Sequence, residues 1–194
     1  MVGRTVLAGS LALGVLAGCG GTGGPTDPRD PAPEPGGATS TTAAQRGGGR
    51  VIRAIVTHVS DGDTVRARTG GQVVRVRLLG IDAPETKDPR RPVACYGPEA
   101  SARARVLMPP GAPVTLVTDP TQDERDRYGR LLAYVFTVGD RRPVNERLVR
   151  DGAARVYVFH PSRPFLRVAA FRDAEADARA ASRGLWGRCP DATR

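Results

Sequence analysis

Carboxylate side chains occur in two short clusters, each beside residues that favour a turn. Asp61 and Asp63 stand on either side of a glycine, and Asp82 and Glu85 follow an apolar run. Alone, the first cluster is more typical of a turn closed by an Asx hydrogen bond than of a metal site. If both clusters lie at the ends of neighbouring strands, however, their oxygen atoms form a ligand set that suits a hard cation such as Ca²⁺.

Two arginines could act together with these carboxylates on a phosphate group. Arg77 interrupts an apolar run that leads toward Asp82, and Arg130 ends the charged segment 126–130. Separately, Arg77 fits the outward position of an alternating strand, and 126–130 fits a solvated loop. Together with a divalent cation that polarises the phosphate, two guanidinium groups could neutralise its oxygens while a carboxylate deprotonates water. The combined pattern is consistent with phosphoryl chemistry, for which the planar, permanently charged guanidinium is well suited.

The elements that must position these residues follow from hydrophobic periodicity and turn signals. Three consecutive hairpin-like strands predict a meander that brings the two acidic clusters together. A helix interrupts the strands and further helices follow, which predicts a β-barrel with helices (α+β), a small five-stranded barrel of OB type. The predicted strands are 51–59, 64–68, 73–79, 114–117 and 131–138, and the predicted helices are 99–108, 144–150 and 165–183.

The N-terminal region has a different composition from the rest of the 194-residue chain. Residues 1–18 contain Arg4 and an apolar run over 6–17 that is shorter than the ~20 residues of a spanning helix. The run ends in Leu-Ala-Gly before Cys19, which resembles the lipobox of bacterial lipoproteins. We expect a lipoprotein signal peptide over 1–18 and a lipid-modified Cys19 on the extracytoplasmic face of a membrane. An ordinary signal peptide cleaved nearby is the alternative.

Residues 19–49 are rich in Gly, Pro and Thr and have no apolar periodicity, so we expect a disordered tether after the lipidated cysteine. The folded domain is then 50–194, one domain of ordinary size. The formal net charge of +9 favours polyanionic partners such as nucleic acid, anionic lipid or acidic glycans without choosing among them. With Cys19 lipidated, Cys95 and Cys189 remain as a pair in an oxidising compartment, and we expect a disulfide between them. Two unpaired thiols are the alternative.

Six stretches of the chain resemble the staphylococcal nuclease (thermonuclease) family and occur in the family's order between Val51 and Gly187. They are DGDTV at 61–65, RLLGIDAPET at 77–86, YGPEAS at 96–101, DRYGRLLAY at 126–134, VNERLVRDG at 144–152 and GLW at 184–186. The resemblance implies an OB-fold barrel with three helices and a calcium-dependent hydrolysis of phosphodiester bonds in DNA and RNA. Nothing in the sequence demands more than a monomer.

The resemblance also implies roles for single residues. Asp63 and Asp82 would bind calcium through their carboxylates and Ala83 through its main-chain carbonyl, where many family members have threonine. Arg77 and Arg130 match the residues that bind the phosphate in the transition state. A separate match concerns Glu85, which falls on the carboxylate usually described as the general base, whereas Asp61 would be an acidic neighbour of the metal.

Three further residues, Arg127, Tyr128 and Tyr157, match positions that hold the sugar and phosphate of the bound nucleotide. The segment around Tyr157 is one residue shorter than in the family, so ordinary strand packing is an equal expectation for this side chain. His58 and His160 have no matching role, and we expect Trp186 to pack at the C-terminus.

Two other classes of function compete with a nuclease. A catalytically inactive OB-fold module could bind nucleic acid or a protein partner, but such a module would lose members of the carboxylate and arginine set, all of which are present here. A basic surface that adheres to anionic polymers would explain the charge and leave the acidic clusters unexplained. The sequence therefore favours the calcium-dependent nuclease.

Overall fold

The computed structural model describes residues 48–87, 89 and 92–189. The predicted signal peptide, Cys19 and almost all of the predicted tether lie outside these residues. The domain begins where Gly49 packs against the main chain of Thr118, since a Cβ atom at Gly49 would lie 1.5 Å from the Thr118 carbonyl oxygen. Arg50 then pairs with the same residue through main-chain and side-chain hydrogen bonds.

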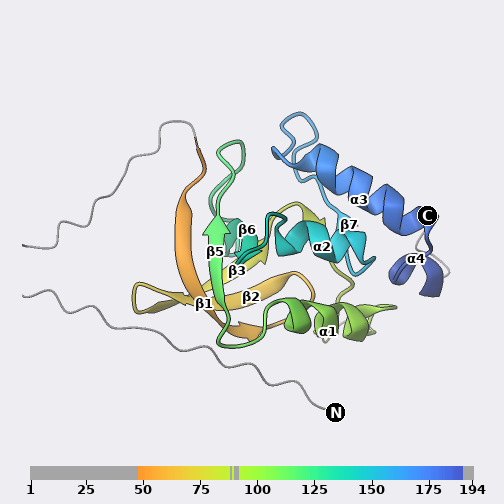
Figure 1. The fold of residues 1–194 in the computed structure, drawn as a ribbon, viewed down its shortest axis with the longest axis horizontal. Coiled ribbons are helices and arrows are strands. Elements are labelled where there is room, and N and C mark those ends of the chain that lie inside the picture. Colours follow the sequence, from red (N-terminus) through yellow and green to blue (C-terminus); the bar gives the residue numbers. More distant parts are fainter. Residues whose placement is uncertain (1–47, 88, 90–91, 190–194) are drawn as a thin grey trace, which may run out of the picture. The chain divides into compact units, whose positions relative to one another are not determined.

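The core of the fold is a closed five-stranded barrel, as predicted (Figure 1). Its strands follow the order β1-β2-β3-β6-β5 around the barrel, with β3 and β6 parallel and the other neighbours antiparallel. The predicted meander of the first three strands is confirmed. The barrel strands are β1 (Val51–Val59), β2 (Thr64–Thr69), β3 (Gln72–Leu78), β5 (Pro113–Val117) and β6 (Leu131–Thr137).

Alternation along the strands decides which side chains fill the barrel. Val65 and Ala67 of β2, and Val76 and Leu78 of β3, are completely buried, whereas the arginines between them point outward. Because successive residues of a strand face opposite sides, a sequence of alternating valine and arginine both fills the core and places positive charge on the outer surface.

The structure adds elements that the periodicity did not predict. A two-stranded sheet pairs β4 (Ile81–Asp82) with β7 (Arg155–Val156). The helices are α1 (Gly97–Leu107), α2 (Val144–Arg150), α3 (Val168–Ala180) and the single turn α4 (Leu185–Arg188), and α2 lies between the barrel and α3 (Figure 1). None of the helices within the described residues is long and apolar enough to span a bilayer.

The predicted helix over 165–183 is too long. The chain becomes helical only at Val168, because Phe165 instead folds into the core, where it is 2% exposed. At the other end, Ser182 and Gly184 adopt positive φ angles of 48° and 57°, which interrupts a right-handed helix. The remaining residues form α4 as a separate turn.

The turn between β3 and β4 is held from both sides. Asn145 of α2 is fully buried, and its side-chain amide donates hydrogen bonds to the carbonyl oxygens of Leu79 (2.9 Å) and Ala133 (3.1 Å). Gly80 has a φ of 80°, and a Cβ atom there would lie 2.6 Å from the Phe165 ring. The turn that leads into Asp82 is therefore fixed by the helical layer.

The loop between β5 and β6 is fixed by one buried carboxylate. Asp119 is 3% exposed and accepts hydrogen bonds at both oxygens. The main-chain N–H and hydroxyl of Thr121 donate to Oδ1, and the Tyr134 hydroxyl and the Leu166 N–H donate to Oδ2. These bonds tie the loop to β6 and to the segment before α3.

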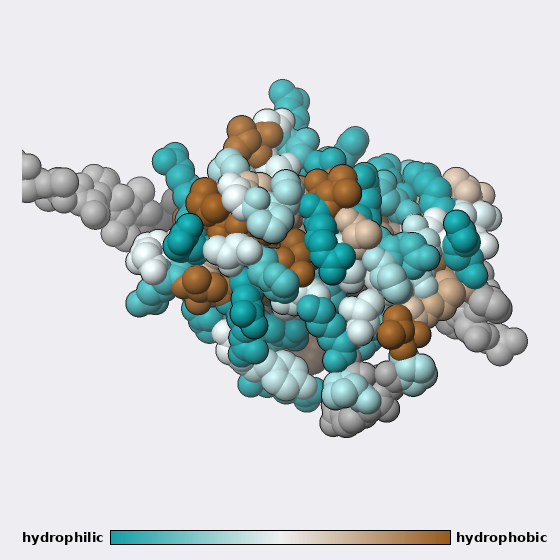
Figure 2. Space-filling model, turned by 90° about the horizontal axis from the view of Figure 1, so that it is seen from below, coloured by the Kyte–Doolittle hydropathy of each residue, from teal (hydrophilic) through white to brown (hydrophobic). Residues whose placement is uncertain are grey.

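The face of the domain drawn in Figure 2 is mainly hydrophilic. In the face shown in Figure 2, apolar side chains are scattered among charged and polar ones. Such scattered exposed apolar residues are normal for a folded domain and do not indicate an apolar docking surface.

Candidate active site

The two acidic clusters lie together at one end of the barrel. The Ala83 N–H donates to Asp63 Oδ2 over 2.8 Å, and the Leu78 N–H donates to the Asp63 main-chain carbonyl over 2.8 Å. Gly62 allows this approach, because a Cβ atom there would lie 2.5 Å from that of Ala83. The turn after β1 and the end of β3 therefore meet, as the predicted meander requires.

Arg77 lies between the two carboxylates. Its Nη2 is 3.1 Å from Asp63 Oδ2 and 3.1 Å from Asp82 Oδ1. Its Nη1 donates to the carbonyl oxygens of Leu78 (3.0 Å) and Ile81 (2.7 Å), and the side chain is 14% exposed. The guanidinium group is thus held rigidly, with one edge against the main chain and the other against both acids.

Negative charge exceeds its local compensation at this end of the barrel. Burial and the negative charges of Asp63 and Glu85 raise the pKa of Asp61 to about 6. Burial and the charge of Asp63 also raise the pKa of Asp82, although Arg77 and Arg155 offset part of this increase. Mutual repulsion of this kind is typical of carboxylates arranged to receive a cation or a substrate.

Arg130 reaches the same place from the loop before β6. Asp126 accepts hydrogen bonds from the Arg130 main-chain N–H (2.9 Å) and from its Nε (2.7 Å). Burial tends to raise the pKa of Asp126, but these bonds outweigh it and lower the pKa. Arg130 Nη1 lies 3.3 Å from Thr64 Oγ1, and Thr64 is the cross-strand partner of Arg77. The two arginines therefore converge, although 53 positions separate them in the sequence.

A cavity of about 560 Å³ opens beside these arginines. Its wall includes Asp82 and all three residues predicted to bind substrate, namely Arg127, Tyr128 and Tyr157. The guanidinium groups of Arg127 and Arg130 lie over the Tyr128 ring, at 4.8 and 5.3 Å from its centre. Tyr128 is 55% exposed, so its ring is accessible to a ligand.

Tyr157 is not a packed strand residue. It follows the end of β7, donates its N–H to the Gly80 carbonyl oxygen over 2.9 Å and is 48% exposed. Phe159 and His160 line the cavity beside it, with ring centres 4.5 Å apart. Sequence reasoning assigned these two residues no role in the site. The spacing of Tyr157 and Phe159 was the available signal for Phe159, since residues two apart lie on the same side of an extended segment, whereas no such signal marks His160.

The carboxylate of Glu85 is turned toward its own loop. Its Oε1 accepts hydrogen bonds from the N–H groups of Thr86 (2.9 Å) and Lys87 (2.7 Å). Its charge nevertheless acts on both Asp61 and Asp82. Arg77 and Arg130 thus line the cavity, whereas Glu85 stands in the adjoining loop within electrostatic range.

The donor set at this end of the barrel fits a hard cation. Within the described part of the chain, no three Asp, Glu, His or Cys side chains form a metal cluster. The predicted ligands are instead two carboxylates and one main-chain oxygen, and Asp63, Asp82 and Ala83 are adjacent here. A positively charged group, the Arg77 guanidinium, already contacts both carboxylates. Oxygen donors are what Ca²⁺ requires, and a cation bound here would take these two carboxylates from Arg77.

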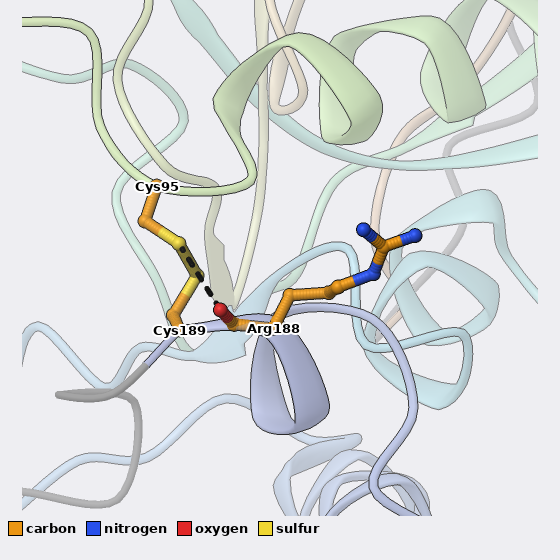
Figure 3. Close-up of a disulfide and its surroundings, with 3 residues drawn as sticks. All are labelled: Cys95, Arg188 and Cys189. Carbon is orange, nitrogen blue, oxygen red and sulfur yellow. Dashed lines mark hydrogen bonds between the residues drawn. A yellow bond between two sulfur atoms is a disulfide. The ribbon is translucent and has the colours of Figure 1, made fainter.

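Cys95 and Cys189 are joined by a disulfide (Figure 3). Their Cα atoms are 5.9 Å apart, within the usual range for such a bond. The bond connects the segment before α1 to the end of α4. Cys95 Sγ lies 3.8 Å from the Arg188 carbonyl oxygen, a contact and not a hydrogen bond, because a bridged sulfur carries no proton.

Two residues with no predicted role in the chemistry, Trp186 and His58, lie outside the cavity. Trp186 is 8% exposed, and the guanidinium groups of Arg179 and Arg155 lie 4.1 and 5.4 Å from its ring centre. His58, expected to be a surface or packing residue, is exposed on β1. Neither residue lines the cavity described above.

Comparison with known proteins agrees with this site. The family model "Staphylococcal nuclease homologue" matches residues 75–188. The SPbeta prophage-derived endonuclease YokF of Bacillus subtilis (strain 168) is 40% identical over 129 residues, which are 66% of this chain and 42% of the relative. Endonuclease YncB of the same organism is 36% identical over 140 residues, 72% of this chain and 64% of the relative.

The thermonuclease of Staphylococcus hyicus is 34% identical over 137 residues, 71% of this chain and 74% of that protein. The chain thus spans less than two thirds of the length of the two Bacillus endonucleases. Because the family model matches more than half of the chain and the barrel agrees with it, the protein belongs to the staphylococcal nuclease family.

Proposed function

We propose that this protein is a calcium-dependent endonuclease that hydrolyses phosphodiester bonds of DNA or RNA. The observation that carries the proposal is the convergence of Arg77 and Arg130, from distant parts of the sequence, on one cavity beside the paired carboxylates Asp63 and Asp82. The relatives named above are endonucleases and a thermonuclease, which supports the same activity.

The two arginines act on the phosphate. Arg130 can donate its remaining Nη N–H groups to non-bridging oxygens, and Arg77 can donate the N–H groups of Nη2 once a cation takes Asp63 and Asp82 from them. Both side chains are held in place before substrate arrives. Donors fixed in this way stabilise the charge that develops in the transition state without reorganising during the reaction. Asp63, Asp82 and the Ala83 carbonyl would hold calcium, which when bound polarises the phosphate.

Glu85 acts as the base in this proposal. The hydrogen bonds that Glu85 accepts from Thr86 and Lys87 use Oε1, which leaves Oε2 to accept a proton from the attacking water as far as the described residues are concerned. The water oxygen bonds to phosphorus, its proton passes to Glu85, and the bond from phosphorus to the leaving sugar oxygen breaks. That oxygen then takes a proton from solvent.

The nucleotide next to the scissile bond lies in the cavity. Arg127 is available to a phosphate, and the exposed rings of Tyr128 and Tyr157 are available to a sugar or a base. Aromatic rings stack on any base, which is compatible with a broad range of nucleic-acid substrates.

An inactive OB-fold binding module is the alternative function, and one experiment separates the two. Purified protein is incubated with plasmid DNA and with a single-stranded RNA, in calcium or in a calcium chelator. Cleavage that calcium supports and the chelator abolishes is the expected result. Tight binding without cleavage would establish the binding module, and full activity in the chelator would exclude calcium dependence.

We further propose that the protein is exported, with residues 1–18 as its signal peptide, and is anchored to the outer face of the cell membrane through a lipid on Cys19. A tether over 19–49 would then separate the monomeric domain from the bilayer. The lipobox-like sequence before Cys19 supports this. Labelled lipid should attach to the full-length protein, and Cys19→Ala should release it from membranes. A protein that remains soluble with Cys19 intact would refute the anchor.

A further inference from the structure

Three arginines form a row on the outer face of the barrel. Arg66 and Arg68 follow the buried residues Val65 and Ala67 of β2, and Arg75 lies between the half-buried Val74 and the buried Val76 of β3. All three side chains point outward and are exposed. Arg66 and Arg75 are direct partners across the two strands. We refer to Arg66, Arg68 and Arg75 as the β2–β3 arginine row.

The charge of this row is not compensated by acidic neighbours. Among the residues that the structure describes, none of the three forms an ion pair, whereas Arg103 and Arg147 pair with Asp151 and Asp140. Like charges placed directly opposite each other in antiparallel strands, as Arg66 and Arg75 are, destabilise the sheet. Residues whose arrangement destabilises the fold are typical of a surface with a functional role.

The row is continuous with the cavity. Arg75 Nη2 donates to the Tyr128 carbonyl oxygen over 2.8 Å, which joins the row to the loop that carries the predicted nucleotide-binding residues. Arg77 lies two residues further along the same face of β3. Successive outward residues of a strand are about 7 Å apart, so the path from Arg77 past Arg75 to the level of Arg68 extends about 14 Å. That length extends beyond one nucleotide, so the row can contact more than one phosphate of a bound strand.

We infer that the β2–β3 arginine row binds the phosphates of the nucleic-acid strand on one side of the scissile bond. This inference rests on the proposed nuclease function and extends it from a single nucleotide to an oligonucleotide. A linear row that ends at the cavity complements a linear polyanion whose reacting phosphate lies in that cavity. The same two strands of OB-type barrels commonly present oligonucleotide-binding faces.

Salt dependence of binding tests the inference without catalysis. The full-length protein and the variant Arg66→Gln/Arg68→Gln are titrated against a fluorescent single-stranded 20-mer and a fluorescent dinucleotide, in a calcium chelator, between 50 and 200 mM salt. Each lost contact to a single-strand phosphate reduces the slope of log K against log salt by about 0.7. For the 20-mer, the variant should therefore lose about sevenfold less affinity across this range than the wild type.

The matched control is Arg105→Gln/Arg172→Gln, which removes two exposed arginines from α1 and α3 and changes the net charge equally. Its 20-mer slope should stay within about 0.3 of the wild type. Equal slope changes in both variants would overturn the inference, because net charge alone would then explain binding. If the double variant is unstable, Arg68→Gln alone should give about half of the change.

Two further arms exclude other interpretations. The dinucleotide is too short to reach the row, so its salt slope should be the same in the variant and the wild type, and a loss of slope there would overturn the inference. Vesicles containing anionic phospholipid test the competing partner: weaker vesicle binding with an unchanged 20-mer slope would assign the row to a membrane surface. Binding without cleavage in the plasmid assay with calcium would refute the proposed nuclease alone. Cleavage in that assay together with unchanged salt slopes in the titrations would refute the row alone.

Discussion

Two buried aspartates of this domain show opposite ways to place a carboxylate. Asp119 and Asp63 are almost equally buried, at 3% and 6% exposed. Asp119 accepts hydrogen bonds from Thr121, Tyr134 and Leu166 and has no acidic partner among them. Asp63 faces Arg77 and, beside it, other acids whose pKa values its charge raises. The first site stabilises the fold, and the second stores repulsion that a cation can relieve.

The pKa values express the same contrast. Burial tends to raise the pKa of Asp119, but the hydrogen bonds from Thr121, Tyr134 and Leu166 outweigh it and lower the pKa. At the acidic end of the barrel, burial and neighbouring negative charge act together, and the pKa of Asp61 is raised to about 6. A carboxylate with saturated hydrogen bonds is thus structural, and a carboxylate surrounded by other acids is a candidate for function.

The end of the barrel that carries Asp61, Asp63, Asp82 and Glu85, here called the acidic end, is connected to the C-terminal region by the disulfide. Breaking this bond should therefore destabilise the acidic end. The Ala94 N–H donates to the Glu85 carbonyl oxygen, and the Cys95–Cys189 bond follows immediately. The bond closes a loop of 94 residues, for which the chain-entropy model gives at most about 4.7 kcal/mol. Reduction should lower the free energy of unfolding by up to this amount, measured by urea denaturation.

Hydrogen exchange of the reduced protein tests whether the disulfide stabilises the loop around Glu85 more than the loop fixed by Asp119. Amide exchange should accelerate in the loop around Glu85 and in α4, and it should change little in the loop fixed by Asp119. The oxidised protein under the same conditions is the control. Equal acceleration in both regions would show that the disulfide stabilises the whole domain and not the acidic end in particular.

The arginines at the acidic end should affect the reaction more than the fold. Removing one charged donor to the transition state costs about 3 to 4 kcal/mol, or a factor of roughly 10² to 10³ in kcat. Arg77→Ala and Arg130→Ala should show losses of this size in a plasmid cleavage assay. Arg105→Ala, an exposed residue of α1, serves as the control. Near-normal turnover in either folded variant would remove that arginine from the site.

Substitution of Asp119 should affect the fold more than the reaction. In Asp119→Asn the amide nitrogen cannot accept a hydrogen bond, so at least one buried donor loses its acceptor and the remaining bonds lose their ionic character. We expect the free energy of unfolding to fall by about 2 to 4 kcal/mol at pH 7.

The pH dependence gives an independent check of Asp119. Because the folded-state pKa is below the unfolded value of about 3.9, the carboxylate stabilises the protein above that pH and loses this contribution as pH falls through the folded pKa. The difference in stability between wild type and Asp119→Asn should therefore shrink below about pH 4. A difference that persists unchanged at pH 2.5 would mean that the ionised form of Asp119 is not what stabilises the loop.

The smallest expected effect concerns Asp61. Asp61→Asn removes a negative charge from a crowded, partly buried site, so the metal-free protein should be unchanged or more stable by up to about 1 kcal/mol. Urea denaturation in a calcium chelator measures this directly. A loss of more than 1 kcal/mol would show that Asp61 stabilises the fold, as Asp119 does, and that crowding by other acids does not distinguish the two residues.

Local pattern in the sequence determined much of this protein. Alternation of valine and arginine predicted β2 and β3, and proline and glycine punctuation predicted the ends of α1 and α2. Residues 165–167 escaped this reasoning, because the burial of Phe165 against Gly80 is a tertiary contact with no periodic signal. The short pair β4 and β7 escaped it for the same reason, since two residues per strand carry no pattern.

For the candidate site, too, the sequence predicted one part and the tertiary structure decided another. Residue types and motif order in the sequence predicted Asp63, Asp82, Arg77 and Arg130 as site residues, because a divalent cation and a phosphate would each require particular chemical groups. Only the tertiary structure decided that Arg77 bridges the two carboxylates, that Glu85 turns toward its own loop, and that Phe159 and His160 line the cavity. Side-chain direction depends on packing and hydrogen bonds between segments far apart in the chain, and no local pattern of residues encodes those.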